Sequence, residues 1–195
     1  MGGTIITSSA SHSRIGRARA WLETRLPAEE ILILAATDDA ANELARDVAR
    51  NKGAAFRWHR LSLAQFAAVL AGPRLAERGL VTVGDLGVRA VCARVVHRLA
   101  ANGALGRYAI IANAPGFAPA LARVMTDLRL ANLDPDTVRG VAPDLTPLLE
   151  AYESDLSEGG FTDWAGLLTI ATNALTSDGF THRFIACLPF CWTCL

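Results

Sequence analysis

Long uncharged apolar runs are absent from this 195-residue chain, and none reaches the roughly 18 residues that a membrane-spanning helix needs. No basic segment precedes the first apolar residues, so the N-terminus lacks the pattern of a secretory signal. Ile6 stands where an N-myristoylation signal requires Ser or Thr. These absences exclude three routes to a membrane, and we expect a soluble, cytoplasmic protein with no membrane partner.

Cysteine and lysine are also scarce. Four cysteines are too few for a small disulfide scaffold, and Lys52 is the only lysine among 19 basic residues. Hydrophobic residues make up 51% and charged residues 19%, which excludes a disordered chain. The net charge is zero, but residues 1–100 carry 14 Lys/Arg against 9 Asp/Glu, and residues 101–195 carry 5 against 10. This asymmetry fits a polyanion-facing N-terminal half and equally fits two halves that attract each other.

The first 60 residues alternate between strand and helix signals. The continuous apolar run Ile31–Ala35 is typical of a parallel strand buried on both faces. After it, Thr37 is placed to cap a helix with a regular apolar stripe. The expected elements are a strand at 4–8, a helix from an N-cap at Ser13 to about Arg25 that Pro27 closes, the strand Ile31–Ala35, a helix up to Gly53 and a strand at 54–58. This order predicts the start of a parallel α/β fold.

Beyond Ser62 the apolar residues recur with a helical period, and strand signals largely vanish. Helices are expected at 62–70, 85–101, 117–130, 145–156 and 163–175. Turn signals separate them, at Gly72-Pro73, Asn102-Gly103, Asp134-Pro135 and Gly159-Gly160. We therefore expect an α/β portion at 1–71, a helical insertion at 72–175 and an atypical tail at 176–195.

The loop after the first expected strand has the spacing of a phosphate-binding loop without its chemistry. In the pattern GxxxxGK[S/T], glycines admit the phosphates, Lys contacts them and the hydroxyl holds Mg²⁺. Here Ser8 and Ser13 replace the glycines, Arg14 replaces Lys and Ile15 replaces the hydroxyl residue. Ile15 has no oxygen for a metal, so we expect no ATP hydrolysis. The same residues also fit an ordinary strand-to-helix turn with a serine cap.

Four segments match the motifs of a known family in order and spacing. Residues 31–44, ILILAATDDAANEL, combine an apolar strand, a Thr and a helix that opens with paired alanines. Residues 61–70, LSLAQFAAVL, combine a Ser with an aromatic-containing helix. Residues 148–153 supply a Tyr-bearing helix, and residues 160–168 an Asp-led helix with paired leucines. Over about residues 4–185 the chain resembles the N-terminal part of superfamily 1 helicases of the UvrD/RecB type, most closely the AddB-like subunits of helicase-nucleases.

The resemblance implies a fold class and roles for individual residues. The fold class is α/β, a partial P-loop NTPase-like parallel sheet with an all-helical insertion. In active relatives the first two motifs contact the backbone of single-stranded DNA, which points to Thr37, Arg60 and Ser62 as DNA-binding residues. Arg14 is then the remnant of the phosphate loop. The expected partners are single-stranded DNA and a helicase-nuclease partner subunit or the missing C-terminal part.

The resemblance also implies what the chain lacks. The family's acidic strand, which serves Mg²⁺ and water activation, is replaced by residues 183–190, RFIACLPF, without a carboxylate. ATP and Mg²⁺ are therefore expected only in intact family members, and we expect no cofactor, metal or catalytic residue here. The family's nuclease domain lies outside these residues, so whether the chain belongs to an enzyme stays open.

The last residues differ in composition from the rest of the chain. Cys187, Cys191 and Cys194 cluster there with a proline and aromatic residues. One hypothesis is a reading frame truncated or shifted near Ala186. The cysteine spacing also matches the radical-SAM iron–sulfur motif, and His182 with these cysteines has plausible zinc-ligand spacing. These alternatives remain open.

Other chemically capable side chains are expected to be structural. Trp21, Cys92, Tyr152 and Trp164 fit core positions, His97 a surface position, and Glu150 and Glu153 a solvated helix face. The sequence therefore predicts a non-catalytic scaffold from an AddB-like DNA-repair helicase-nuclease, acting on single-stranded DNA in double-strand-break repair. The alternatives are a small nucleotide- or phosphate-binding α/β enzyme that uses Ser8, Ser11 and Ser13, and a truncated fragment without function.

Overall fold

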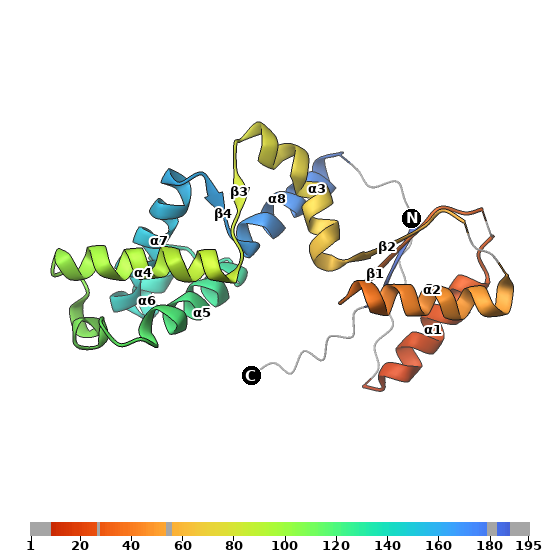
Figure 1. Cartoon of the computed structure of the whole chain (residues 1–195), viewed down its shortest axis with the longest axis horizontal. Helices are drawn as coiled ribbons and strands as arrows, with labels where there is room; N and C mark the ends of the chain where they lie inside the picture. The colour runs from red at the N-terminus through yellow and green to blue at the C-terminus, as the bar shows by residue number, and fades with distance from the viewer. Residues whose placement is uncertain (1–8, 27, 54–55, 179–182, 188–195) are drawn as a thin grey trace. The chain divides into compact units, whose positions relative to one another are not determined.

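A computed structural model of the chain describes residues 9–26, 28–53, 56–178 and 183–187 (Figure 1). The structure is mixed α/β, with helices predominating. It divides into two compact units, unit 1 with Met1–Val69 and Asp178–Leu195, and unit 2 with Leu70–Ser177. The strand expected at 4–8 lies outside the described residues, as do Pro27 and most of the cysteine-rich tail.

Unit 1 contains a three-stranded parallel sheet in the order β2-β1-β5. Its strands are β1 (Ile31–Ala35), β2 (Trp58–Ser62) and β5 (Arg183–Cys187). Every residue of β1 is buried, which confirms the expected parallel strand. Of the strand expected at 54–58, residues 54 and 55 lie outside the described residues, and the described part is wrong, because β2 begins only at Trp58. Arg57 has a φ of 63°, a left-handed conformation that does not continue an extended strand.

Two helices cover β1 in unit 1, α1 (Ser11–Glu23) and α2 (Asp38–Lys52). Thr37 is the N-cap of α2, as expected. Ser13 is not the N-cap of α1: that position is Ala10, and the Ser13 and Arg14 N–H groups both donate to the Ala10 carbonyl, at 3.1 and 3.4 Å. The apolar stripe of α2 packs with α1, one face of β1 and the first residue of β2 into one core: Ala18, Leu22, Ile31, Ile33, Ala35, Ala41, Leu44, Ala45, Val48 and Trp58.

The helix α3 (Leu63–Glu77) begins in unit 1 and ends in unit 2. The turn expected at Gly72-Pro73 is wrong, because the helix continues through Pro73. Proline in a helix interior removes one backbone hydrogen bond and costs about 3 kcal/mol. Burial of Ala67 and Ala71 on the same helix offsets part of this cost.

Unit 2 is built mainly from helices α4 (Asp85–Ala101), α5 (Phe117–Leu130), α6 (Pro135–Val141), α7 (Thr146–Glu158) and α8 (Trp164–Asp178, its last residue in unit 1). Short 3₁₀ helices lie at Gly106–Ile111 and Pro143–Leu145. The bounds expected for α4 and α5 are confirmed. Asp134-Pro135 is not merely a turn: the Asp134 carboxylate accepts a hydrogen bond from Thr137 N at 2.7 Å and starts α6. The strands β3 (Val81–Thr82) and β4 (Phe161–Thr162), which pair in parallel, were also not expected.

A buried carboxylate joins α4 to α7 inside unit 2. Asp155 is 1% exposed and accepts hydrogen bonds from Arg94 Nε, at 2.7 Å, and from Arg98 Nη1. Burial alone would raise the pKa of Asp155, but the hydrogen bonds from Arg94 and Arg98 outweigh it and hold this pKa below its ordinary value. The ionised form of Asp155 is therefore the one that stabilises the packed helices.

A second buried carboxylate, Asp163, joins α5, α7 and α8. Arg129 donates to it through Nε at 2.7 Å and Nη2 at 3.3 Å, and the Tyr152 hydroxyl donates at 3.1 Å. Gly166 N also donates to Asp163, at 2.9 Å, so the same carboxylate caps the start of α8. Burial, together with the charge and hydrogen bond of Asp163, raises the pKa of Tyr152. Tyr152 is thus a core residue with a satisfied hydroxyl.

We expect Asp155→Asn to lower the free energy of unfolding at pH 7 by roughly 2 kcal/mol, the usual worth of hydrogen bonds to a charged group. The native pKa lies below the unfolded value of about 3.9, so this stabilisation is present above about pH 4 and is lost as pH falls through the native pKa. Urea denaturation of both proteins along a pH series measures the difference, which should shrink under acid conditions. A difference that stays constant with pH would contradict this account.

Gly166→Ala should destabilise unit 2 by roughly 1–3 kcal/mol, although alanine favours helices. A Cβ at Gly166 would overlap the Thr162 hydroxyl and lie 3.4 Å from Asp163 Oδ1. Gly140→Ala in α6 is the matched control, because its Cβ would meet nothing within 4 Å. Thermal unfolding followed by circular dichroism compares the two variants. Equal melting temperatures would contradict this, because they would mean that the residues around Gly166 accommodate the added Cβ without loss of stability.

Candidate nucleic-acid contact site

Two helices start next to each other at the carboxyl edge of the sheet in unit 1. β1 and β2 are parallel neighbours, and their last residues, Ala35 and Ser62, pair in register. Thr37 Oγ1 accepts a hydrogen bond from Ala40 N at 3.2 Å and caps α2. Ser62 directly precedes α3. Parallel strands therefore bring the two sequence-predicted hydroxyl residues to the same edge.

The start of α3 is a reciprocal capping box. Gln65 N donates to Ser62 Oγ at 3.2 Å, and Ser62 N donates to Gln65 Oε1 at 2.9 Å. This is the S-x-x-Q arrangement, in which the side chain of each residue accepts a hydrogen bond from the backbone N–H of the other. The same four residues appear in the sequence as Ser62-Leu63-Ala64-Gln65, so the pattern was available from sequence.

Asp38 ties the two helix starts together. Its Oδ1 accepts from Ser62 N at 3.1 Å, and its Oδ2 accepts from Gln65 Nε2 at 2.6 Å. Asp38 is itself the first residue of α2. One carboxylate on α2 therefore holds the first turn of α3 in place, and this link was not predicted from sequence.

The arrangement offers hydrogen-bond donors to an anion. The oxygens of Thr37 and Ser62 accept capping hydrogen bonds, and neither O–H is used by another described residue. Helix N-termini carry partial positive charge, which favours anions. Asp38 and Asp39 place two carboxylates in the first turn of α2 and offset that charge. This edge therefore offers an anion the hydroxyl groups of Thr37 and Ser62 as hydrogen-bond donors, and its electrostatic field is not strongly positive.

Arg60 lies on β2, opposite Ile33 of β1. By the alternation of a strand, it shares a face with Trp58 and Ser62. Arg60 is exposed and forms no ion pair with any residue that the structure describes. Two residues near it in the sequence do contact a carboxylate: the guanidinium of Arg57 and the ring of His59 lie 3.0 and 3.1 Å from Glu30.

The residues predicted to form a degenerate phosphate loop do not form a loop where the structure describes them. Ser8 lies outside the described residues, whereas Ser13, Arg14 and Ile15 all lie within α1. The N–H groups of Ser13 and Arg14 are taken by the Ala10 carbonyl, so they are not free for a phosphate. Arg14 Nη2 donates to Ser11 Oγ at 3.0 Å, and Ile15 is 43% exposed. The described part of this segment is therefore a helical turn.

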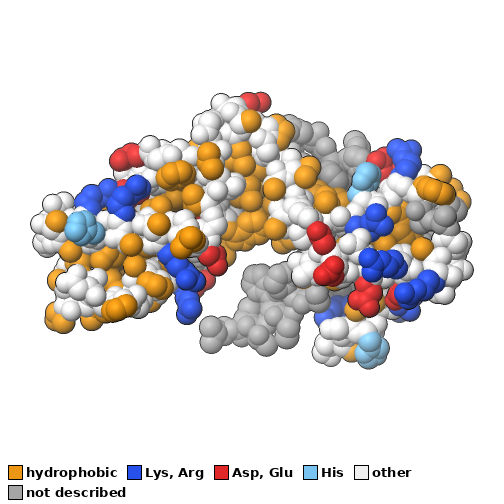
Figure 2. Space-filling model, viewed as in Figure 1, with side chains coloured by type: hydrophobic (Ala, Val, Ile, Leu, Met, Phe, Trp, Pro, Cys, Tyr) orange, Lys and Arg blue, Asp and Glu red, His pale blue; other side chains and the backbone are white. Residues whose placement is uncertain are grey.

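Charge on unit 1 is mixed rather than of one sign. Figure 2 shows basic and acidic side chains interspersed over α1 and α2. Asp47 illustrates this, since it pairs with Arg19 and, at 3.0 Å, with Arg50. The basic surplus in the N-terminal half of the sequence thus does not form a continuous positive patch on the face shown.

The other candidate side chains are structural where the structure describes them. Cys92 is fully buried, and burial raises the pKa of its thiol to about 12. His97 is exposed, as expected. Glu153 was expected on a solvated face, but it is only half-exposed and pairs with Arg129 at 2.6 Å. Glu150 pairs with Arg139 at 2.7 Å.

Sequence reasoning missed both buried carboxylates of unit 2. Asp155 occupies a position on the buried stripe of α7, with Leu148, Tyr152 and Leu156. A carboxylate at such a position signals a buried ion pair, and that signal was present in the sequence. Asp163 was expected as the start of a helix, but its contact with Arg129 of α5 joins residues 34 positions apart, which no local pattern reveals.

No metal or membrane site emerges from the described part of the chain. No group of three or more His, Cys, Asp or Glu side chains there is arranged to hold a metal. None of its helices combines the length and apolar character needed to cross a bilayer. His182, Cys191 and Cys194 lie outside the described residues, and the side chain of Cys187 is not described.

Comparisons with known protein families and with curated proteins find no match.

We expect Asp38→Ala to lower the free energy of unfolding by about 1–2 kcal/mol, because Gln65 Nε2 loses its acceptor and Ser62 N keeps only Gln65 Oε1. Asp39→Ala is the matched control: it removes the same charge from the same helix turn, without a hydrogen bond to α3 among the described residues. Its cost should be a few tenths of a kcal/mol, the usual charge–dipole contribution. Urea denaturation gives both values, and equal losses would mean that charge rather than the link to α3 matters.

Proposed function

We propose that this chain is a non-catalytic scaffold of an AddB-like DNA-repair helicase-nuclease, which contacts the phosphate backbone of single-stranded DNA. The observation that supports this most is the meeting of Thr37 and Ser62 at one edge of the sheet. These residues belong to the two motifs that touch DNA in the family the sequence resembles. The proposal includes a cytoplasmic location and a partner helicase-nuclease subunit or a C-terminal part.

The chemistry of the edge suits a phosphodiester. Phosphate oxygens accept hydrogen bonds from Ser and Thr hydroxyls and from Arg, and such contacts position a strand without reading its sequence. Thr37 and Ser62 supply two hydroxyl donors, and Arg60 supplies a guanidinium that is not committed to a described carboxylate. The carboxylates of Asp38 and Asp39 oppose a highly charged ligand, so an internal phosphodiester suits the edge better than a triphosphate.

The alternative is a small enzyme that binds a nucleotide through Ser8, Ser11 and Ser13. Within the described residues, Ser11 Oγ already accepts from Arg14, and the N–H groups of Ser13 and Arg14 are occupied. The sequence of β5, Arg183–Cys187, contains no carboxylate for Mg²⁺. These observations favour the DNA-contact proposal over a nucleotide-dependent enzyme.

Arg60→Ala should weaken binding of a fluorescent single-stranded oligonucleotide about fivefold at low salt, the order expected for one exposed charge contact. The slope of log affinity against log salt should fall by about 0.7. Fluorescence anisotropy over a KCl series measures both quantities. Arg123→Ala on α5 is the matched control, an exposed arginine without a described ion partner, and it should leave binding unchanged.

The same titration with ATP and Mg²⁺ separates the alternatives. DNA binding that salt weakens, without nucleotide binding, supports the scaffold. Nucleotide binding without DNA binding would overturn it in favour of the enzyme, and binding of neither by an aggregating chain would favour the truncated fragment. Equal effects of Arg60→Ala and Arg123→Ala would show that general charge, rather than the sheet edge, attracts the strand.

A further inference from the structure

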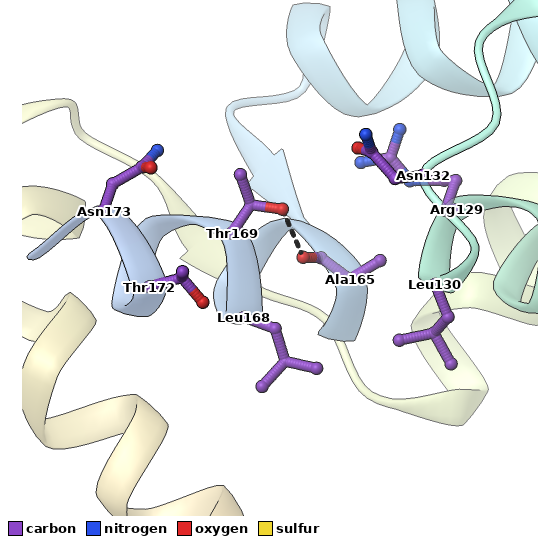
Figure 3. A pocket seen from close by; sticks show the side chains of 8 residues that line it. All are labelled: Arg129, Leu130, Asn132, Ala165, Leu168, Thr169, Thr172 and Asn173. Carbon is purple, nitrogen blue, oxygen red and sulfur yellow. Dashed lines mark hydrogen bonds between the residues drawn. The ribbon is translucent and has the colours of Figure 1, made fainter. Parts of the chain in front are cut away.

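A cavity of about 230 Å³ lies in unit 2 beside α8 and the end of α5 (Figure 3). Five of its lining residues, Ala165, Leu168, Thr169, Thr172 and Asn173, follow one another at helical spacing on a single face of α8. The opposite wall consists of Arg129 and Leu130 at the end of α5, and Asn132 just beyond it. The cavity is smaller than the roughly 300–1,000 Å³ typical of sites for drug-sized ligands, so its occupant is a small one.

The charges around the cavity favour a neutral ligand. Arg129 is the only charged lining residue, and its nitrogens are committed to Asp163 and, through Nη1 at 2.6 Å, to Glu153. Burial alone would lower the pKa of Arg129, but its hydrogen bond and charge interactions with these carboxylates raise it. Two carboxylates thus already face this one positive charge, so an anion gains little. A cation finds no carboxylate among the lining residues.

The lining nevertheless offers unused hydrogen-bonding groups. The side chains of Asn132, Thr172 and Asn173 form no hydrogen bond with any residue in the described ranges. Figure 3 shows Asn173 and Asn132 at opposite ends of the lining, with Thr169 between them. Thr169 differs, because its hydroxyl donates to the Ala165 carbonyl at 3.0 Å. Each free asparagine amide presents a donor and an acceptor side by side.

An apolar surface accompanies these amides. Leu130, Ala165 and Leu168 contribute the apolar side chains of the lining, and Leu168 and Leu130 lie together at one side in Figure 3. The complementary ligand is therefore small and neutral, with an apolar face and with donors and acceptors along its edge. Nucleobases combine these properties, and asparagine amides pair with their edges through two adjacent hydrogen bonds.

We propose that this cavity binds a nucleobase. The inference is independent of the proposed function, because every lining residue belongs to unit 2, whereas Thr37, Arg60 and Ser62 belong to unit 1. A ligand with so few atoms binds in roughly the millimolar range. The asparagine amides distinguish a base from a purely apolar ligand of the same size.

The test is an NMR titration of the full ¹⁵N-labelled chain with adenosine and cytidine, with methyl glucoside as the sugar control. The nucleosides should shift the amide resonances of the cavity-lining residues, and the glucoside should not. The double variant Asn132→Gly/Asn173→Ala should bind at least tenfold more weakly. Asn132 has a φ of 54°, so glycine removes the amide there without backbone strain. Alanine at position 173 lies within α8, where it favours the helix.

Asn113→Ala is the matched control, an exposed asparagine that does not line the cavity, and it should bind as the wild type does. Circular dichroism checks that all variants keep their helices. Glucoside shifts at the same residues, the absence of nucleoside shifts, or unchanged affinity in the folded double variant would each overturn the proposal.

Discussion

The parallel pairing of β1 with β2 is the constraint on which the arrangement of unit 1 depends. Parallel strands point the same way, so the helices that follow them must start at the same edge. Here α2 starts after β1 and α3 starts after β2, which brings Thr37 and Ser62 together. An antiparallel pair would place these residues at opposite edges. The capping box is local to the start of α3, whereas the Asp38 link to Ser62 and Gln65 forms only because of this alignment.

Unit 2 depends instead on buried carboxylates. Asp155 and Asp163 are 1% and 4% exposed; Asp155 of α7 pairs with Arg94 and Arg98 of α4, and Asp163, just before α8, pairs with Arg129 of α5. A buried carboxylate without such a partner would be costly, and each of these two is satisfied by hydrogen bonds from arginine. The two carboxylates therefore specify which helix faces meet, in addition to the apolar contacts of α4, α5 and α7.

Local signals predicted those elements whose ends depend on neighbouring residues. The apolar run of β1, the Thr37 cap and the bounds of α4 and α5 all followed from short-range patterns. The helix through Pro73 did not, because a proline is locally a helix breaker and the burial of Ala67 and Ala71, which favours the helix, is not visible in a local pattern. β3 and β4 are each two residues long and pair across about 80 residues, which no periodicity reveals. In the candidate site, the hydroxyl residues were predictable, whereas the contact of Asp38 with α3 required the sheet register.

The position of β5 has a consequence for the order in which the protein folds. β5 pairs with β1, yet about 150 residues separate them, and all of unit 2 lies between. During synthesis, which proceeds at about 5–20 residues per second, unit 2 is complete before β5 leaves the ribosome. The edge of β1 that β5 later pairs with therefore stays unpaired for several seconds. Unpaired β-sheet edges of this kind can pair with other chains. Assembly of the sheet is slow for a topological reason, since pairing of such high contact order must wait for the intervening segment.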